Sequence, residues 1–179
     1  RLYCKKLQGI SEGLLKVMTG NDFCGSTPEE MAVLTLKERG LTVTTAESCT
    51  GGMVASRLVN VKGASAVFHQ GYITYCDEAK HMMLGVSRKT LEQYSAVSEQ
   101  TAGEMAEGGA CAAGADVCVS VTGVAGPDTE DGKPVGCVYI GCYYRGKTQV
   151  RGFNFDGDRM SIRCQAADEA LKFIIDTVS

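Results

Sequence analysis

What this chain of 179 residues lacks excludes several classes of protein. No run of about 18 apolar residues occurs, so no segment is expected to cross a membrane. Lysine and arginine never run beyond a pair and the formal net charge is −3, so no basic face for nucleic acid is expected. The chain has no C-x-x-C pair, and its only histidines are His69 and His81. Since the spacing of a zinc site is missing, we expect neither a metal nor a cofactor.

Cysteine is the residue type that stands out among those present. An odd number of cysteines, scattered without a motif, is typical of a reduced protein that uses cysteine as a small apolar side chain. We therefore predict a cytoplasmic location and a structural role for most of them. The nine cysteines stand at positions 4, 24, 49, 76, 111, 118, 137, 142 and 164.

Length and composition indicate one globular domain with a short appendage. Hydrophobic residues make up 44% and charged residues 22% of the chain, which is ordinary for a globular protein. Apolar residues at helical spacing predict a helix over about 1–20, followed by a linker that reaches residue 26. Residues 27–179 are expected to form the domain itself.

The domain alternates helices with strands. Thr27-Pro28-Glu29-Glu30 combines a capping hydroxyl, an early proline and two acids, which predicts a helix start, and Gly40 ends that helix. Asp77, Ser87 and Ser98 are expected to cap three further helices, the last of which is rich in alanine and glycine and should pack closely against a neighbour. We predict an α/β fold, a three-layer α/β/α sandwich on a mixed, mostly parallel sheet of about five strands. Strands are expected near 41–46, 71–76, 116–121, 135–144 and 147–155, and helices near 27–40, 50–59, 77–84, 87–94, 98–113 and 156–177.

Three loops at the ends of predicted strands are expected to meet. They cover Glu47–Gly52, Cys76–Lys80 and Thr122–Pro127. In a sheet with parallel strands such loops gather at the carboxyl edge, where ligands bind. The first of them also aims backbone N–H groups and a positive helix end at its surroundings, which favours an anion or a polarised carbonyl there.

Ser48 is the first candidate for a nucleophile. A serine needs a base, and neither histidine has the spacing of a catalytic triad. Lys80 is the better candidate, because the first turn of its helix and burial both favour a neutral amine, whereas Asp77 and Glu78 favour the charged form. Tyr75 is placed to relay a proton or to bind substrate. The competing interpretation is that Ser48 caps the following helix and Lys80 is a solvated surface residue.

Two neighbours of Ser48 have open roles. Cys49 is a competing nucleophile, because a helix N-terminus lowers the pKa of a thiol; its alternative is a small residue turned into the core. Glu47 either hydrogen-bonds the backbone of the turn or binds a hydroxyl of a ligand, and its spacing from the other residues favours neither role.

Two loops and an arginine pair are candidate phosphate sites. Backbone N–H groups of Thr50-Gly51-Gly52 and of Gly123–Gly126 can cradle a phosphate. Neither loop matches a Walker motif, however, and most loops of this kind are plain turns. Arg159 and Arg163 stand four residues apart on one face of the last helix, where they either clamp a phosphate or form a solvated face.

Together these segments resemble the C-terminal domain of the competence/damage-inducible CinA proteins, a family that includes nicotinamide mononucleotide deamidase. The resemblance keeps its order from about residue 28 to the end of the chain. It rests on TAESCTGG at 45–52, GYITYCDEAK at 71–80, GV at 85–86, AVSE at 96–99, TGVAGPD at 122–128, KPVG at 133–136 and GDR at 157–159.

The resemblance implies an enzyme of NAD salvage that hydrolyses the carboxamide of nicotinamide mononucleotide to nicotinate mononucleotide and ammonia. It implies Ser48 as the nucleophile and Tyr75 and Lys80 as its activating partners. The amide N–H groups of Cys49 or Thr50 would suit the oxyanion of such a reaction. The predicted substrate-binding residues are Thr122, Gly123 and Arg159, which the resemblance implies, and Glu47, Cys49, Thr50, Gly51 and Arg163, which the turn and the last helix add.

The sequence also departs from the family pattern and leaves a second function open. The acidic segment Asp128–Gly132 stands where the family often has a glycine run, which indicates weaker phosphate binding or a different substrate. The alternative is a non-catalytic nucleotide-binding or regulatory module of a larger protein. From the resemblance alone we expect residues 1–26 to be the remnant of an upstream domain, and the protein to be a homo-oligomer, a dimer or higher.

Overall fold

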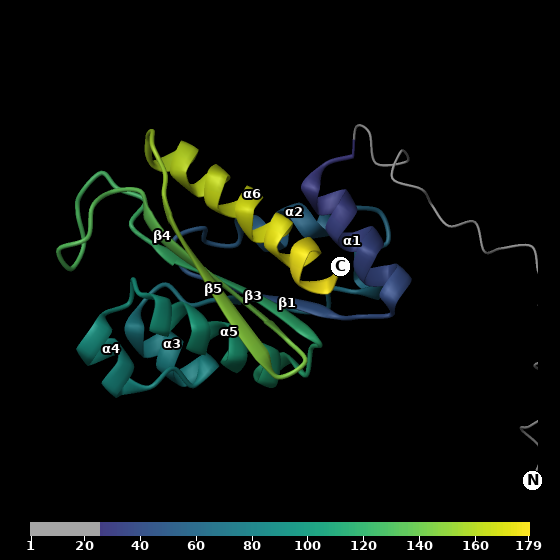
Figure 1. Cartoon of the computed structure of the whole chain (residues 1–179), viewed down its shortest axis with the longest axis horizontal. Helices are drawn as coiled ribbons and strands as arrows, with labels where there is room; N and C mark the ends of the chain where they lie inside the picture. The colour runs from purple at the N-terminus through teal and green to yellow at the C-terminus, as the bar shows by residue number, and fades with distance from the viewer. Residues whose placement is uncertain (1–25) are drawn as a thin grey trace, which may run out of the picture.

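The computed structural model describes residues 26–179, and its centre is a sheet of five strands in the order β2-β1-β3-β4-β5 (Figure 1). The helix predicted over 1–20 and the linker up to residue 25 lie outside the described residues, so that part stays a prediction. The strands are β1 (Val43–Glu47), β2 (Tyr72–Ile73), β3 (Val117–Gly123), β4 (Cys137–Tyr144) and β5 (Lys147–Asn154).

Helices cover both faces of the sheet and confirm the three-layer α/β/α architecture (Figure 1). None of the described helices is long and apolar enough to cross a membrane. On one face lie α1 (Pro28–Arg39), α2 (Met53–Val59) and α6 (Arg159–Val178), and on the other lie α3 (Asp77–Leu84), α4 (Arg88–Tyr94) and α5 (Glu99–Ala113).

The sheet is mixed, as predicted, but its parallel share is smaller than predicted. β1 pairs in parallel with both β2 and β3. The pairs β3–β4 and β4–β5 are antiparallel. The tight turn Arg145-Gly146 accounts for the β4–β5 pair, because such a turn joins only antiparallel strands. The departure from the prediction is the antiparallel β3–β4 pair, which residues 124–136 connect.

Local side chains set several helix ends as the sequence predicts. Thr27 accepts a hydrogen bond from the N–H of Glu30, whose carboxylate accepts one from the N–H of Thr27. Gly40 ends α1 in the left-handed conformation. Ser98 accepts a bond from the N–H of Thr101 and so caps α5. Caps of this kind depend on neighbours in sequence, which is why they could be predicted.

One strand and two helix caps differ from the prediction. The strand predicted over 71–76 is only the two-residue β2, because only Tyr72 and Ile73 have strand partners in β1. Asp77 does not cap α3 but is its first residue, after Cys76 at the cap position. Ser87 stands at the cap position of α4, but its side chain makes no capping bond. Its N–H instead donates to the carboxylate of Glu104 in α5.

Small residues bring α5 against both the sheet and α3. A Cβ atom at Gly108 would stand 1.7 Å from the carbonyl oxygen of Leu84 in α3, so no side chain fits there. A Cβ atom at Gly109 would stand 2.6 Å from the sulfur of Cys118 in β3. The predicted close packing of this helix is therefore confirmed, and it fixes the position of α3, the helix that carries Lys80.

Candidate active site

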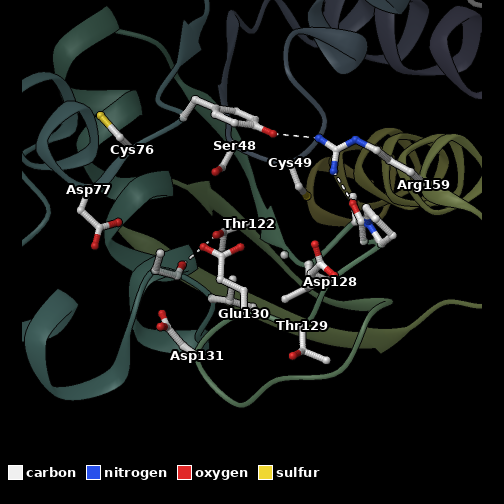
Figure 2. A pocket seen from close by; sticks show the side chains of 18 of the residues that line it. Ser48, Cys49, Cys76, Asp77, Thr122, Asp128, Thr129, Glu130, Asp131 and Arg159 are labelled. Atoms are coloured by element: carbon white, nitrogen blue, oxygen red, sulfur yellow. Dashed lines mark hydrogen bonds between the residues drawn. The ribbon is translucent and has the colours of Figure 1, made fainter.

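The three predicted loops meet around one cavity of about 560 Å³ (Figure 2). The turn after β1 contributes Ser48, the segment around the start of α3 lies beside it, and the loop after β3 closes the opposite side. Ala96 and Val97, which belong to the AVSE segment but are not among the predicted site residues, and the first residue of α6 complete the lining. The lining residues are Ser48, Cys49, Tyr75–Asp77, Lys80, Ala96, Val97, Thr122–Asp131 and Arg159.

Glu47 holds the turn of residues 48–52, the Ser48 turn, from behind. Its side chain is fully buried, and its carboxylate accepts hydrogen bonds from the N–H groups of Gly52, Val54 and Ala55 at 2.9, 3.1 and 2.8 Å. These are the amides that the start of α2 leaves without partners. Glu47 therefore bonds the backbone and does not line the cavity, so its predicted contact with a ligand hydroxyl is wrong.

Ser48 does not cap the helix, so the competing interpretation of this residue is wrong. The cap position of α2 is Gly52, and Glu47 supplies the bonds that a capping serine would make. The N–H of Ser48 donates to the carbonyl of Val121 at 2.9 Å. Ser48 lines the cavity and retains 9% of its surface exposed. Backbone bonds therefore hold Ser48 at the cavity, and its hydroxyl takes no part in them.

Arg163 lies behind the same turn rather than in the cavity. Its Nε donates to the carbonyl of Cys49 at 3.0 Å and its Nη2 to the carbonyl of Thr50 at 2.7 Å. Neither Arg163, Thr50 nor Gly51 belongs to the lining. The predicted clamp of Arg159 and Arg163 on one phosphate is therefore wrong, because the guanidinium of Arg163 already binds two carbonyl oxygens of the protein.

Lys80 is buried, which overturns the interpretation of a solvated surface residue. Only 2% of its surface is exposed, and it lines the cavity from α3. Its Nζ lies 3.7 Å from a carboxylate oxygen of Asp77, whose side chain is 58% exposed. A buried lysine with one loose partner is unusual outside functional sites, because burial of a poorly paired charge is costly.

Tyr75 and Arg159 both line the cavity, are exposed, and bind each other there; Arg159 is labelled in Figure 2. Nη2 of Arg159 donates to the phenol oxygen of Tyr75 at 2.8 Å, and Nη1 donates to the carbonyl of Gly126 at 2.6 Å. Tyr75 is 62% exposed. Because its oxygen accepts from the guanidinium, the phenol proton remains free to donate to another group.

Cys49 is a poor candidate for a nucleophile. It retains 5% of its surface exposed and packs in the larger apolar cluster of the core. Burial raises the pKa of its thiol to about 12, and the neighbouring Glu47 adds to the rise. The thiol thus stays protonated at neutral pH, whereas attack needs the thiolate. The core interpretation of Cys49 is supported.

Thr122 and Gly123 lie at the end of β3, where both line the cavity. The hydroxyl of Thr122 donates to the carbonyl of Ala96 at 2.7 Å. A Cβ atom at Gly123 would stand 2.6 Å from a methyl carbon of Val138 on β4, so the glycine is needed for packing. Both residues are where the prediction placed them, with the threonine proton already donated to the protein.

Carboxylates dominate the charge of the cavity lining. Asp77, Asp128, Glu130 and Asp131 face two cations, Lys80 and Arg159. In the described part of the chain no group of three or more His, Cys, Asp or Glu side chains is arranged to hold a metal ion. The acidic loop, residues 128–132, therefore contributes negative charge at the side opposite Ser48 (Figure 2).

Comparison with known proteins identifies the family. The model of the CinA C-terminal domain matches residues 26–178. A CinA-like protein of Kosmotoga olearia is 53% identical over 148 residues, and a putative competence-damage inducible protein of Clostridium botulinum (strain Loch Maree) is 45% identical over 168 residues. These matches cover 82% and 91% of this chain but only 36% and 41% of the two relatives.

Solved structures agree with this assignment. A CinA superfamily protein of Klebsiella pneumoniae is 36% identical with a TM-score of 0.82, and the match covers 84% of this chain and 95% of that one. A competence/damage inducible protein of Agrobacterium tumefaciens is 39% identical with a TM-score of 0.81, and the match covers 85% and 96%. The chain therefore belongs to the family of the CinA C-terminal domain.

Proposed function

We propose that the cavity hydrolyses the carboxamide of nicotinamide mononucleotide and releases nicotinate mononucleotide and ammonia. One observation carries the proposal: a serine hydroxyl that makes no cap and a buried lysine line the same cavity. A serine beside a base is the arrangement that attacks a carbonyl carbon. The proposal concerns this domain alone, since the chain spans 36% to 41% of the length of the two curated relatives described above.

The proposed reaction has two steps. The oxygen of Ser48 forms a bond to the carboxamide carbon while the side-chain nitrogen of Lys80 takes the hydroxyl proton. The carbon–nitrogen bond then breaks, and that proton leaves with the nitrogen as ammonia. Water next attacks the ester on Ser48, gives a proton to Lys80, and frees the acid as the proton returns to the serine oxygen. No cofactor is needed for this balance.

Tyr75 and Arg159 are proposed to serve the two ends of the substrate. The free proton of the Tyr75 phenol suits a relay toward the leaving nitrogen. The guanidinium of Arg159 is held by Gly126 and Tyr75 at the cavity, and its remaining N–H donors suit the phosphate. Thr122 and Gly123 are proposed to contact the substrate at the end of β3.

The decisive measurement is ammonia release from the mononucleotide by the wild-type protein and by matched variants. We expect Ser48→Ala and Lys80→Met each to lower kcat at least about 10³-fold with the fold intact. Ser56→Ala on α2 and Lys89→Met on α4 serve as controls, because both residues are exposed and lie outside the cavity. Retained turnover in Ser48→Ala would remove the serine from the mechanism.

Binding and self-association are measured beside the activity. A wild-type protein that binds the mononucleotide in a titration but releases no ammonia would favour the non-catalytic module instead. A panel of pyridine nucleotides fixes the substrate. Sedimentation of the same sample tests the proposed homo-oligomer, which rests on the family alone.

A further inference from the structure

Two buried amide groups of the Ser48 turn have no acceptor. Within residues 26–179, the N–H groups of Cys49 and Thr50 donate to no atom of another residue. The amides on either side are all paired. Ser48 donates to Val121 and Gly51 to Ser48, at 2.9 and 3.0 Å, and Gly52 donates to Glu47 at 2.9 Å. Buried amides are rarely left unpaired, so two in succession directly after Ser48, the first of them on a residue of the lining, point to an acceptor supplied by a ligand.

Arg163 sets the direction of one of these amides. A peptide unit is planar and trans, so the carbonyl of one residue and the N–H of the next point to opposite sides. Because Nε of Arg163 holds the carbonyl of Cys49, the N–H of Thr50 points away from α6. The bond from Nη2 to the carbonyl of Thr50 likewise turns the N–H of Gly51 away, toward Ser48.

The turn is also held from the side opposite Arg163. Glu47 holds the amides of Gly52, Val54 and Ala55 from the other side. Gly51 has a positive φ of 59°, and a Cβ atom on it would stand 3.3 Å from Nη2 of Arg163. The buried carboxylate of Glu47 thus binds N–H groups in and after the turn, while the guanidinium of Arg163 binds its carbonyl oxygens.

We infer that Arg163 is a positioning residue for the oxyanion formed when Ser48 attacks an amide carbon. It holds the amide of Thr50 directly and that of Cys49 through the bond from Gly51 to the carbonyl of Ser48. The inference rests on the proposed function and deepens it. It replaces the predicted role of Arg163 in phosphate binding, and it leaves Arg159 as the arginine that lines the cavity. Loss of one oxyanion donor lowers kcat about 10²- to 10³-fold in acyl transfer.

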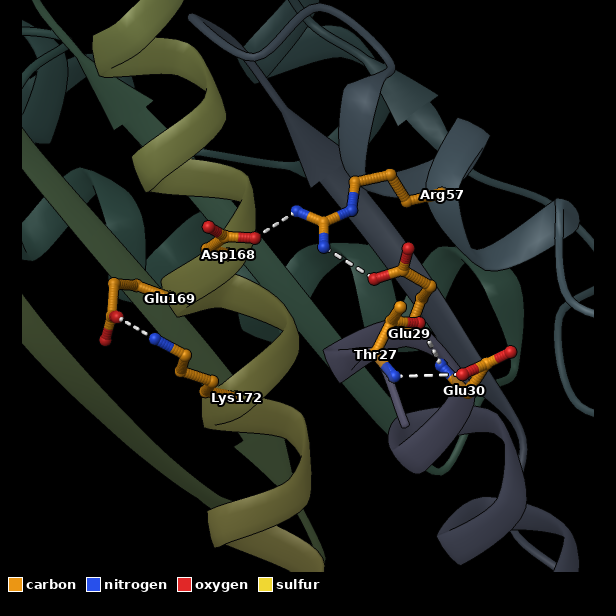
Figure 3. A network of polar contacts seen from close by, with 7 residues as sticks. All are labelled: Thr27, Glu29, Glu30, Arg57, Asp168, Glu169 and Lys172. Carbon is orange, nitrogen blue, oxygen red and sulfur yellow. Dashed lines mark hydrogen bonds and ion pairs between the residues drawn. The ribbon is translucent and has the colours of Figure 1, made fainter. Parts of the chain in front are cut away.

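A merely structural role makes a different prediction, and Arg57 provides the matched control. Arg57 also joins α2 to α6, through an ion pair with Asp168, and it binds Glu29 of α1 at 2.5 Å (Figure 3). Like Arg163, it is half-buried and binds two oxygen atoms. Both of its partners lie outside the Ser48 turn. Arg57→Gln therefore reports the cost of a lost α2–α6 contact without any change in the turn.

The test compares Arg163→Gln, Arg163→Lys and Arg57→Gln in the full chain. We expect Arg163→Gln to lower kcat about 10²-fold with KM unchanged within twofold, because the lost interaction acts only in the transition state. Arg163→Lys should recover part of the loss, since an ammonium can still reach one carbonyl. Arg57→Gln should lower stability in urea and leave kcat unchanged. Equal kcat values in Arg163→Gln and Arg57→Gln, or a rise in KM alone, would overturn the inference.

A second readout separates this inference from the proposed function. A fluorophosphonate reacts with an activated serine through a charged oxygen that needs the same amide donors. If the wild-type protein releases no ammonia but the probe labels Ser48, the proposed function fails, and the inference then requires labelling at least 10-fold slower in Arg163→Gln than in Arg57→Gln. A wild-type protein that neither releases ammonia nor takes the label overturns both.

Discussion

The Ser48 turn and the acidic loop lie on opposite sides of one cavity, yet within residues 26–179 only the turn is held by hydrogen bonds from side chains. Glu47 and Arg163 together make five hydrogen bonds to the backbone in and after the turn. In the acidic loop, Glu130 and Lys133 exchange two backbone bonds, and the carboxylates of Asp128, Glu130 and Asp131 bond no described residue. The turn is built for geometry, whereas the loop contributes charge.

Glu47→Gln should have the largest effect of these changes, because it removes hydrogen bonds that hold the Ser48 turn and the start of α2. An amide supplies one acceptor and one donor in place of two carboxylate oxygens, so at least one amide of α2 loses its partner and faces another donor. We expect unfolding in urea to show a loss of about 3 kcal/mol, with kcat reduced as well. Glu104→Gln is the control, because Glu104 likewise bonds the start of a helix, α4, but lies outside the cavity. An equal effect of both changes on kcat would contradict the contrast.

A pair of glycine substitutions compares the two sides directly. Gly52 and Gly132 both have positive φ, 91° and 72°. A Cβ atom at Gly52 would stand 3.0 Å from Cδ1 of Ile73, whereas one at Gly132 meets nothing within 4 Å. Gly132→Ala should therefore cost only backbone strain, about 1 kcal/mol, and Gly52→Ala about 2 kcal/mol with a loss of kcat. Thermal unfolding and ammonia release measure both, and identical values would remove the distinction.

Neutralising the acidic loop should change selectivity rather than stability. In Asp128→Asn/Glu130→Gln/Asp131→Asn the cavity loses three negative charges. Nicotinamide riboside is a cation, whereas the mononucleotide is a net anion, so the ratio of kcat/KM should move about 3- to 10-fold toward the mononucleotide, and less at high salt. Ammonia release from both substrates at two ionic strengths gives the ratio. A ratio that stays constant would show that these carboxylates do not face the substrate.

Thiol labelling compares the reactivity of two cysteines that line the cavity, Cys49 in the Ser48 turn and Cys76 before α3. Burial raises the pKa of the Cys49 thiol to about 12, so it stays protonated through pH 9, while Cys76 is exposed. Iodoacetamide at pH 8 should label Cys76 at least 10-fold faster than Cys49, as measured by peptide mass spectrometry. Exposed Cys111 serves as the reference. Labelling of Cys49 as fast as Cys111 would return it to the list of nucleophiles.

The sequence predicted what depends on neighbours and on strand direction. The cap at Thr27, the stop at Gly40 and the start at Ser98 are local, and the meeting of three loops follows from parallel pairing of β1 with β2 and β3. The short β2 could not be predicted. β-Branched and aromatic residues favour a strand, but they do not show how many residues pair with a neighbouring strand.

The roles of Glu47 and Arg163 needed the structure. The sequence favours neither role of Glu47, because burial decides between them and burial is not local. Arg163 reaches carbonyls 114 and 113 residues earlier in the chain, and its spacing from Arg159 gave the wrong impression of a pair. Side chains that bond the backbone of a remote turn leave no pattern in the sequence, because any carbonyl can be their partner.

The contact between Gly108 and Leu84 has a consequence for mutational scans of this protein. The depth of Lys80 in the cavity is set by α3, and α3 can approach α5 only because position 108 carries no side chain. A library scored by turnover should therefore report position 108 as intolerant of every replacement, although it lies outside the cavity lining. A redesign of the substrate range should therefore keep Gly108 unchanged, because this glycine fixes the helix that carries Lys80.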